Sequence, residues 1–446
     1  MERQSLSTLT AWKSSPYRKP LIVQGVRQVG KTWLIMHFGQ KYYQNTVRIA
    51  FDEHPEYKQF FETTKDPRRI IPNLSIACSQ PIHPENTLLF FDEIQECPEA
   101  LNALKYFCED APQYHVICAG SLLGLTLAQP ASFHVGKVNF LTLYPMTFNE
   151  YLGASDSSSL ATYLKALEKI EPLPDAFFNP LCEKLKMYFI CGGLPEPLRL
   201  MAEEHDVPST SSALSDILKA YAYDMTKHAA LSQFPRIQSI WNSLPFQLSR
   251  ENKKFKLSAL GKNARNREYS EALQWLLSAN MVYRVCRCSE PRLPLSAYAD
   301  HSAFKLFSCD VGLLRQLSQL DPMVFKEGSR LFTEFKGALT ENYILQALLP
   351  QLKTEPYYWA QNNPPYEVDF LVQQGNDVFP VEVKAATSVH SRSLVRYKEK
   401  FGDTVKLRVR FSLQNLRLDG DLLNIPLFLA DETCRLIALA LEQRRE

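Results

Sequence analysis

The sequence predicts a multidomain α/β protein that begins with a core built on a parallel sheet. Three observations lead to this fold class. Apolar segments alternate with helix-compatible segments between residues 21 and 143. A glycine-rich turn separates the first apolar segment from the first helix. After residue 331 a new series of strand-like segments begins, which predicts a second α/β domain.

Length and composition indicate a globular protein of several domains. A chain of 446 residues is too long for one hydrophobic core. The hydrophobic content of 45% and charged content of 22% are typical of globular proteins, and the net charge is only +2. We predict a core over 1–155, a helical lid over 156–212, a winged-helix-like domain over 213–330 and an α/β domain over 331–446.

The cysteines and the apolar segments predict a cytoplasmic protein. The ten cysteines are scattered, and Cys286 and Cys288 are the only close pair, so neither a disulfide framework nor a zinc site is expected. No window reaches the roughly 18 apolar residues that span a bilayer. The polar opening Met1–Ser5 does not resemble a signal peptide. We expect no membrane partner.

Residues 25–32 read Gly-Val-Arg-Gln-Val-Gly-Lys-Thr, the pattern G-x-x-x-x-G-K-[ST]. The apolar segment Leu21–Val23 precedes it and a helix-compatible segment follows it, which is the context that gives the pattern meaning. The glycines let backbone N–H groups point at a phosphate, and the helix N-terminus adds unsatisfied donors. The sequence therefore predicts a nucleoside triphosphate site.

The residue types of this loop indicate individual roles. Lys31 would reach the β- and γ-phosphates of ATP, and the hydroxyl of Thr32 would ligate Mg²⁺. The residues expected to contact the nucleotide are Gly25, Val26, Arg27, Gln28, Val29, Gly30, Lys31, Thr32 and Trp33.

A second acidic motif follows about sixty residues later. After a strand at 47–51, four apolar residues at 88–91 lead directly into Asp92 and Glu93. This indicates a buried parallel strand that ends at a ligand, because ligands bind at the carboxyl ends of such strands. Asp92 would hold Mg²⁺ and Glu93 would polarise the attacking water.

The remaining core elements follow in alternation. We predict a helix over 98–110, a strand over 114–119 and a fifth strand over 138–143. Ser121, just after the fourth strand, would either sense the γ-phosphate or cap the next helix, and both alternatives stay open.

The middle of the chain predicts helices and then a winged helix. Helical patterns cover 160–171, 181–190 and 214–228. A short helix at 257–261, a second helix at 268–279 and strands at 281–287 and 304–308 predict a helix-turn-helix with a wing. Between Arg250 and Glu268 seven basic residues accompany two acidic ones, which suits phosphate contacts. Contact with another protein stays an alternative.

The C-terminal third places acidic residues at unusual positions. A predicted helix over 335–349 carries Glu341 on its apolar stripe, where a carboxylate is costly unless paired or bound to a cation. A two-residue turn at Gly375-Asn376 would pair Gln374 with Asp377.

Counting back along this hairpin places Asp369 opposite Glu382. Like charges there are unfavourable, and a divalent cation would resolve the conflict. Lys384 lies on the same face as Glu382 and could orient a water. Asp369 and Glu382 would thus ligate Mg²⁺, with Mn²⁺ as an alternative.

Several motifs together resemble one family of prokaryotic AAA+ ATPases that carry a C-terminal domain of unknown function. They are the loop at 25–32, Phe91-Asp-Glu-Ile-Gln, Ala119-Gly-Ser-Leu-Leu and Leu143-Tyr-Pro-Met-Thr-Phe-Asn-Glu-Tyr-Leu152. The resemblance implies ATP hydrolysis, a helical lid and a winged-helix-like region.

Two positions carry alternatives within this resemblance. The resemblance implies that Pro195 in Gly193-Leu194-Pro195 packs against the nucleotide, although a turn that ends a helix explains it equally well. Lys137 stands where this family has arginine, which weakens any bidentate phosphate contact. A homo-oligomer is implied as well, because AAA+ enzymes often complete their sites between subunits, and no arginine finger is identified.

Glu341, Asp369, Glu382 and Lys384 occur in the order found in PD-(D/E)xK nucleases, which the last domain resembles. The resemblance implies metal-dependent cleavage of DNA. Glu341, Asp369 and Glu382 would be its metal ligands, and Asp369, Glu382 and Lys384 its catalytic residues. Seven basic residues against two acidic ones between Ser391 and Phe411 suit a nucleic-acid backbone. Two alternatives stay open: a nucleotide-dependent switch or scaffold whose last domain binds DNA or a partner without cutting it, and a nuclease directed at RNA.

Overall fold

The computed structural model describes residues 1–120, 136–250, 253–261, 266–327, 333–385 and 391–445. These residues form two compact units. The P-loop unit comprises residues 2–144 and 274–281, and the C-terminal unit comprises residues 145–273 and 282–446 together with Met1. The four-domain division is finer than this one and stays a prediction.

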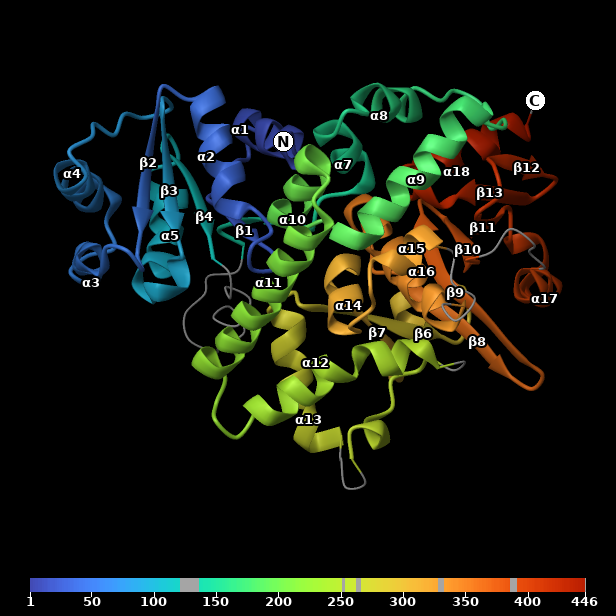
Figure 1. Cartoon of the computed structure of the whole chain (residues 1–446). Coiled ribbons are helices and arrows are strands. Elements are labelled where there is room, and N and C mark those ends of the chain that lie inside the picture. The colour runs from blue at the N-terminus through green and yellow to red at the C-terminus, as the bar shows by residue number, and fades with distance from the viewer. Residues whose placement is uncertain (121–135, 251–252, 262–265, 328–332, 386–390, 446) are drawn as a thin grey trace. The chain divides into compact units, whose positions relative to one another are not determined.

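The P-loop unit is built on a five-stranded sheet in the order β2-β3-β4-β1-β5, and every pairing is parallel (Figure 1). All five strands were predicted from the sequence. Their bounds are β1 Leu21–Gln24, β2 Asn45–Ala50, β3 Thr87–Asp92, β4 His115–Ala119 and β5 Asn139–Thr142.

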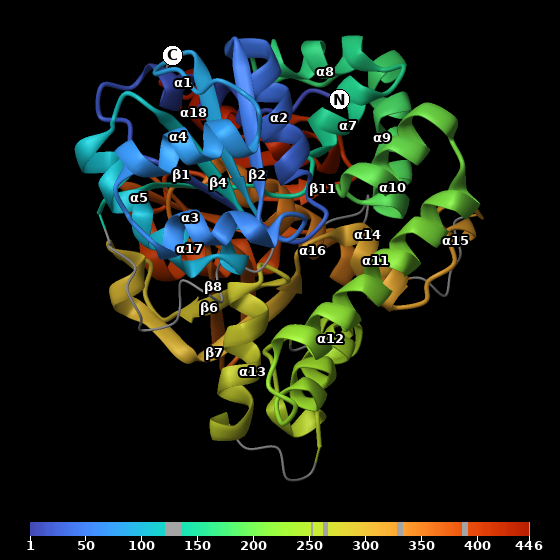
Figure 2. The ribbon, with the colours of Figure 1, turned by 90° about the vertical axis from the view of Figure 1, so that its left-hand side faces the viewer.

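Helices cover both faces of this sheet. Leu89 and Phe91 of β3 belong to a core shared with α3, α4 and α5, whereas Leu88 and Phe90 of the same strand are equally buried outside that core. Because neighbouring side chains of a strand point to opposite faces, the second pair faces the other side, where α2 packs (Figure 2). The bounds are α1 Ser5–Ser14, α2 Lys31–Tyr42, α3 Lys58–Glu62, α4 Pro67–Ala77 and α5 Pro98–Asp110.

The C-terminal unit combines a group of helices with a mixed sheet. Helices α9, α11 and α14 pack against one another, and α16 packs on α12 and α14. The bounds are α7 Phe148–Ala154, α8 Ser158–Lys165, α9 Asp175–Cys191, α10 Pro195–Arg199, α11 Val207–His228, α12 Phe234–Ser249, α13 Asn266–Ser278, α14 Val311–Leu317, α15 Met323–Glu327, α16 Thr333–Leu348, α17 Arg392–Phe401 and α18 Thr433–Gln443. The division into units falls within α13.

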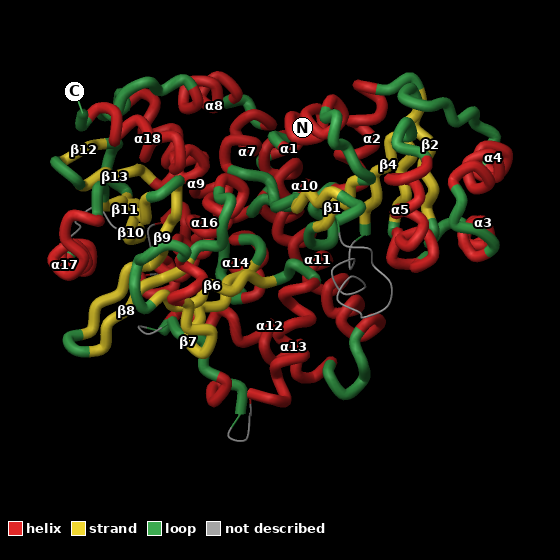
Figure 3. The backbone as a smooth tube through the Cα atoms, turned by 180° about the vertical axis from the view of Figure 1, so that it is seen from behind, coloured by secondary structure: helices red, strands yellow, loops and turns green. Residues whose placement is uncertain are grey.

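The mixed sheet has eight strands in the order β12-β13-β11-β10-β9-β8-β6-β7. Helix α17 packs on β9 and β10, and α16 contacts β7 and β10 (Figure 3). The bounds are β6 Val282–Cys288, β7 Ala299–Ser308, β8 Tyr357–Asn362, β9 Pro365–Gln374, β10 Asp377–Val383, β11 Arg408–Ser412, β12 Arg417–Asp419 and β13 Leu422–Pro426.

Strands β6 and β7 differ from the expected wing. They form the predicted antiparallel hairpin, but β6 also pairs in parallel with β8, so the hairpin is one end of the eight-stranded sheet. The physical reason is burial: Cys286 and Cys288 of β6 join Trp359 of β8 in one apolar core. The sequence pattern identifies the hairpin but not its partner strand. The expected basic residues at 262–265 lie outside the described residues.

Two further findings concern the helices and the cysteines. No helix in the described ranges is long and apolar enough to cross a membrane. All ten cysteines lie within those ranges, where each is a free thiol.

Candidate functional site

The phosphate-binding loop lies between the end of β1 at Gln24 and the start of α2 at Lys31. Gly30 caps the helix with a φ of 93°, a conformation that glycine adopts without strain. A Cβ on Gly25 would lie 2.3 Å from the carbonyl oxygen of Leu143, so no larger residue fits there. Both glycines of the motif are therefore required by the local geometry.

Lys31 places its ammonium group inside the curve of this loop. The side chain is buried, and Nζ donates hydrogen bonds to the carbonyl oxygens of Gly25 at 2.8 Å and Val26 at 3.0 Å. Burial lowers the pKa of Lys31 to about 8, although attraction by Glu93 and Asp92 opposes this shift. Phosphate oxygens would offer this ammonium stronger, charge-assisted bonds than the two carbonyls do.

Thr32 and Asp92 converge at the carboxyl end of β3. The Thr32 hydroxyl lies 3.3 Å and 3.2 Å from the two carboxylate oxygens of Asp92. Asp92 is buried, which raises the pKa of its carboxyl, while the hydrogen bond from Arg48 opposes the rise. A hydroxyl and a carboxylate so placed fit an oxygen-preferring cation such as Mg²⁺.

Glu93 adopts a left-handed backbone conformation with a φ of 46°. This conformation is strained for a residue other than glycine and recurs at functional sites. Gln95 Nε2 donates a 2.5 Å hydrogen bond to Glu93 Oε2, so the carboxylate has a defined orientation.

Sequence reasoning missed three residues of this site. Arg48 on β2 pairs with Asp92 at 2.8 Å, Gln95 orients Glu93, and Arg3 donates to the carbonyl oxygen of Val29 at 3.0 Å. Arg3 also donates to the carbonyl oxygen of Tyr144, so it ties the loop to the end of the core. The only signal for Arg48 is its charge among the apolar residues of the strand predicted over 47–51.

Other positions linked to the nucleotide in the sequence analysis make contacts within the protein. Trp33 is half-exposed and stacks on His37 with ring centroids 4.9 Å apart. Lys137 pairs with Glu109 at 2.6 Å. Pro195 opens α10 directly after Gly192 ends α9, which is the turn that we kept as the alternative. Ser121 lies outside the described residues. The nucleotide contacts of Trp33 and Pro195 stay predictions.

In the C-terminal unit, the β9–β10 hairpin has the predicted register. Gln374 pairs with Asp377, and the pairing continues to Phe370 opposite Val381. The backbone N–H of Val383 donates to Asp369 Oδ2 at 2.8 Å. Lys384 Nζ lies 2.9 Å from Glu382 Oε1. The hairpin therefore brings Asp369, Glu382 and Lys384 together.

Glu341 of α16 joins this group, but two lysines that the sequence analysis did not assign to it come with it. Lys253 pairs with Glu341. Lys305 of β7 lies 3.6 Å from Glu341 Oε2, 3.6 Å from Asp369 Oδ1 and 2.5 Å from Glu367 Oε1. Its side chain has an exposed fraction of 0%.

Electrostatics within this cluster follow from burial and charge. Burial, reinforced by repulsion from Glu341, raises the pKa of Asp369. Burial alone would raise the pKa of Glu341, but Lys253 and Lys305 hold it below its usual value. Across the described ranges, no three His, Cys, Asp or Glu side chains are arranged to hold a metal ion. The metal roles of Glu341, Asp369 and Glu382 stay predictions.

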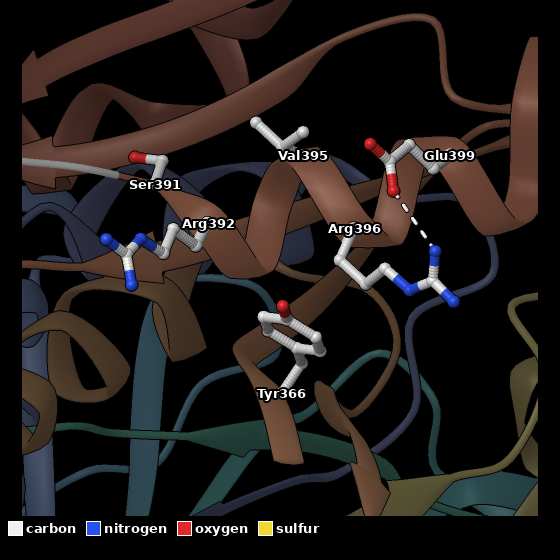
Figure 4. Close-up of a pocket in the computed structure, with 6 residues that line it drawn as sticks. All are labelled: Tyr366, Ser391, Arg392, Val395, Arg396 and Glu399. Atoms are coloured by element: carbon white, nitrogen blue, oxygen red, sulfur yellow. Dashed lines mark hydrogen bonds and ion pairs between the residues drawn. The ribbon is translucent and has the colours of Figure 1, made fainter. Parts of the chain in front are cut away.

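A hollow of about 310 Å³ lies beside α17. Arg392 and Arg396 extend from the helix on either side of Tyr366 (Figure 4). Much of the basic charge predicted around this helix is neutralised within the protein. Lys398 and Arg408 both pair with Asp421, Lys406 pairs with Asp377, and Arg396 pairs with Glu399.

Three segments of the chain match known domain families. Residues 17–152 match an AAA domain. Residues 182–324 match a domain of unknown function (DUF8612), and residues 336–428 match another domain of unknown function (DUF4143). No curated protein matches the chain.

Solved structures share only a distant likeness with this chain. A Walker-type ATPase of Pyrococcus abyssi is 14% identical, with a TM-score of 0.44, over 71% of this chain and 95% of that chain. The Orc1 protein of Aeropyrum pernix in complex with DNA is 11% identical, with a TM-score of 0.29, over 73% and 92%. AMPPCP-bound DnaA from Aquifex aeolicus is 12% identical, with a TM-score of 0.20, over 62% and 84%.

These scores are too low to carry an argument about this chain. The assignment depends on the family match together with the P-loop and the acidic strand end described above. Residues 17–152 of this chain match an AAA domain and carry a phosphate-binding loop and an acidic strand end.

Proposed function

We propose that the AAA domain binds ATP with Mg²⁺ and hydrolyses it. The observation that carries this proposal is the convergence of Thr32 and Asp92 at the end of β3, next to the buried ammonium of Lys31. A strand end, a helix N-terminus and a buried cation are the parts that phosphoryl transfer requires.

In this mechanism each side chain has a separate task. Lys31 exchanges its bonds to the loop carbonyls for bonds to the β- and γ-phosphate oxygens. Thr32 and Asp92 would hold Mg²⁺, which would supply positive charge against those oxygens. Glu93, oriented by Gln95, accepts a hydrogen bond from the attacking water.

The test is ATP turnover and ATP binding by purified variants. Lys31→Ala should lose both, and Glu93→Gln should lose turnover by about 100-fold or more while it still binds ATP. Lys41→Ala is the matched control, because Lys41 is exposed at the other end of α2. Turnover by Glu93→Gln at the wild-type rate would disprove this assignment.

We propose second that the C-terminal unit binds the phosphate backbone of a nucleic acid beside α17 and does not cut it. Arg392 and Arg396 flank an aromatic ring in the hollow there, a combination suited to phosphates and a stacked base. Arg396 would exchange its ion pair with Glu399 for a phosphate. The absence of cleavage is supported by the lysines that already neutralise Glu341 and Asp369. This choice favours the binding alternative over the nuclease.

The binding test compares the wild type with two variants at low salt. Single- and double-stranded DNA and RNA are titrated with wild type, with Arg392→Ala/Arg396→Ala and with Lys219→Ala. The double variant should bind about tenfold or more weakly, because each lost phosphate contact weakens binding. Lys219 is exposed on α11 of the same unit, so its variant should bind as wild type does. Equal binding by all three proteins would exclude the α17 site.

Cleavage is tested with the same nucleic acids in Mg²⁺ or Mn²⁺, with and without ATP. The control is Glu382→Ala/Lys384→Ala, which removes both residues that the nuclease resemblance makes catalytic. We expect no product above this control. Product formed by wild type and lost in the control would restore the nuclease assignment.

A further inference from the structure

We infer that the ammonium group of Lys305 takes the place of a divalent cation in the acidic cluster of the C-terminal unit. The cluster consists of Glu341, Glu367 and Asp369. This inference concerns a different site from the AAA domain and does not depend on ATP hydrolysis. It explains the absence of cleavage that we propose above. Its test measures metal binding, and neither cleavage nor nucleic-acid binding.

The position of Lys305 Nζ is the first argument. This one atom lies between three carboxylates, at 2.5 Å from Glu367 and at 3.6 Å from both Glu341 and Asp369. The three acids come from two elements, helix α16 and strand β9, and their oxygens converge on the same atom. A cation held by oxygen ligands occupies this kind of position.

Burial is the second argument. Lys305 has an exposed side-chain fraction of 0%, and its Nζ lies over the ring of Tyr358, 5.1 Å from the ring centroid. A buried ammonium is retained only where opposite charges compensate its lost hydration. A metal ion could enter only if this buried group left and exposed the carboxylates again.

Charge balance is the third argument. Three carboxylates face the ammonium groups of Lys305 and Lys253, so the cluster carries a net of about one negative charge. A dication added to this set would leave an excess of positive charge in a buried site. Without Lys305 the set carries a net of about two negative charges, which a dication would neutralise.

The fourth observation concerns Glu341 Oε2, which is buried and lies 3.6 Å from Lys305 Nζ. Among the described residues it has no hydrogen-bond partner, so the ion pair with Lys305 is the contact that a metal ion would replace. Asp369 Oδ2 is already engaged by the N–H of Val383. The cluster is therefore a potential cation site with oxygen ligands, and the ammonium group of Lys305 occupies the position of the cation.

The experiment measures Mn²⁺ binding by the full chain without nucleotide, from the loss of the free Mn²⁺ signal in electron paramagnetic resonance. Wild type should show no saturable site that depends on Glu341. Lys305→Ala should gain a saturable Mn²⁺ site that depends on Glu341. It should bind Mn²⁺ at least about tenfold more tightly than wild type does. Lys305→Ala/Glu341→Gln should lose it again.

Two matched variants separate the position of Lys305 from its charge. Lys253→Ala removes the other lysine on Glu341 and should gain no site, because Lys305 still blocks the cluster. Lys305→Met removes the charge but fills the space, so its gain should be smaller than that of Lys305→Ala. A folded Lys305→Ala that binds no more Mn²⁺ than wild type would overturn the inference.

The comparison of wild type with Glu341→Gln remains decisive if Lys305→Ala does not fold. The inference requires both proteins to bind Mn²⁺ equally. A saturable site in wild type that disappears in Glu341→Gln would overturn it. Such a site would leave the α17 proposal intact, because nucleic-acid binding is measured separately.

Discussion

Arg48 lies 2.8 Å from the carboxylate of Asp92, on the strand next to it in the parallel sheet. The same guanidinium lies 2.8 Å from Glu53, so it bridges a buried acid and an exposed one. Arg48 thereby supplies the positive charge that Asp92 needs when no cation is bound.

We expect Arg48→Ala to lower the free energy of unfolding of the P-loop unit by about 1–3 kcal/mol, because it leaves Asp92 buried without a cation. Arg48→Lys should lower the free energy of unfolding by a smaller amount. Urea titrations with and without Mg²⁺ and ATP measure the effect, and the deficit should shrink when both are present. A deficit unchanged by Mg²⁺ and ATP would contradict a shared role of Arg48 and Mg²⁺ at Asp92.

Gln95 should affect turnover more than binding. Its hydrogen bond to Glu93 orients the carboxylate that positions water, so Gln95→Ala should lower kcat by about tenfold with little change in KM. Steady-state ATPase kinetics measure both constants. Gln59→Ala, at an exposed position on α3, should match wild type. A rise in KM alone would show that Gln95 contributes to binding instead.

His115 should make the P-loop unit sensitive to acid. Burial, followed by the charges of Arg18 and Lys13, lowers the pKa of His115 to about 4. The unfolded state therefore binds the extra proton between pH 6.5 and 4, and stability is lost as pH falls through that range. The loss should reach roughly 2–3 kcal/mol.

The measurement is the pH dependence of urea unfolding for wild type and His115→Gln. Subtracting the two curves removes the contribution of the carboxylates. The variant should lose less stability between pH 6.5 and 4 than wild type does. Parallel curves would show that His115 does not titrate in this range.

A substitution at Gly193 would test how closely the C-terminal unit is packed. Its N–H donates to Asp310 Oδ2 at 2.6 Å, and a Cβ there would lie 2.2 Å from the carbonyl oxygen of Met146. Gly193→Ala should therefore destabilise the unit by about 3 kcal/mol or more.

Gly153 provides the matched control for this prediction. It lies within α7, and a Cβ there would meet nothing within 4 Å. Gly153→Ala should raise the thermal midpoint slightly, because alanine favours helix by about 1 kcal/mol over glycine. Thermal unfolding of both variants checks the pair, and a wild-type midpoint for Gly193→Ala would refute the packing argument.

Much of the P-loop unit could be predicted because its signals are local. The parallel strands contain short apolar runs, which Arg48 interrupts in β2, and Gly25 to Thr32 specify their own turn. The β9–β10 register was also predictable, since a two-residue turn determines which residues pair. Arg48 could not be placed in the same way. Its contact with Asp92 depends on which strands are neighbours in the sheet.

The sequence by itself determined the phosphate-binding loop, the acidic end of β3 and the opposition of two acids in one hairpin, because each depends on residues close together in the chain. Only the tertiary structure decided what surrounds those acids. Lys305 lies more than thirty residues before Glu341, on a strand that the sequence assigned to a separate wing. The pairing of β6 with β8 joins that strand to the sheet and brings its ammonium group to the carboxylates. Long-range strand pairing of this kind depends on shared burial, which no local pattern encodes.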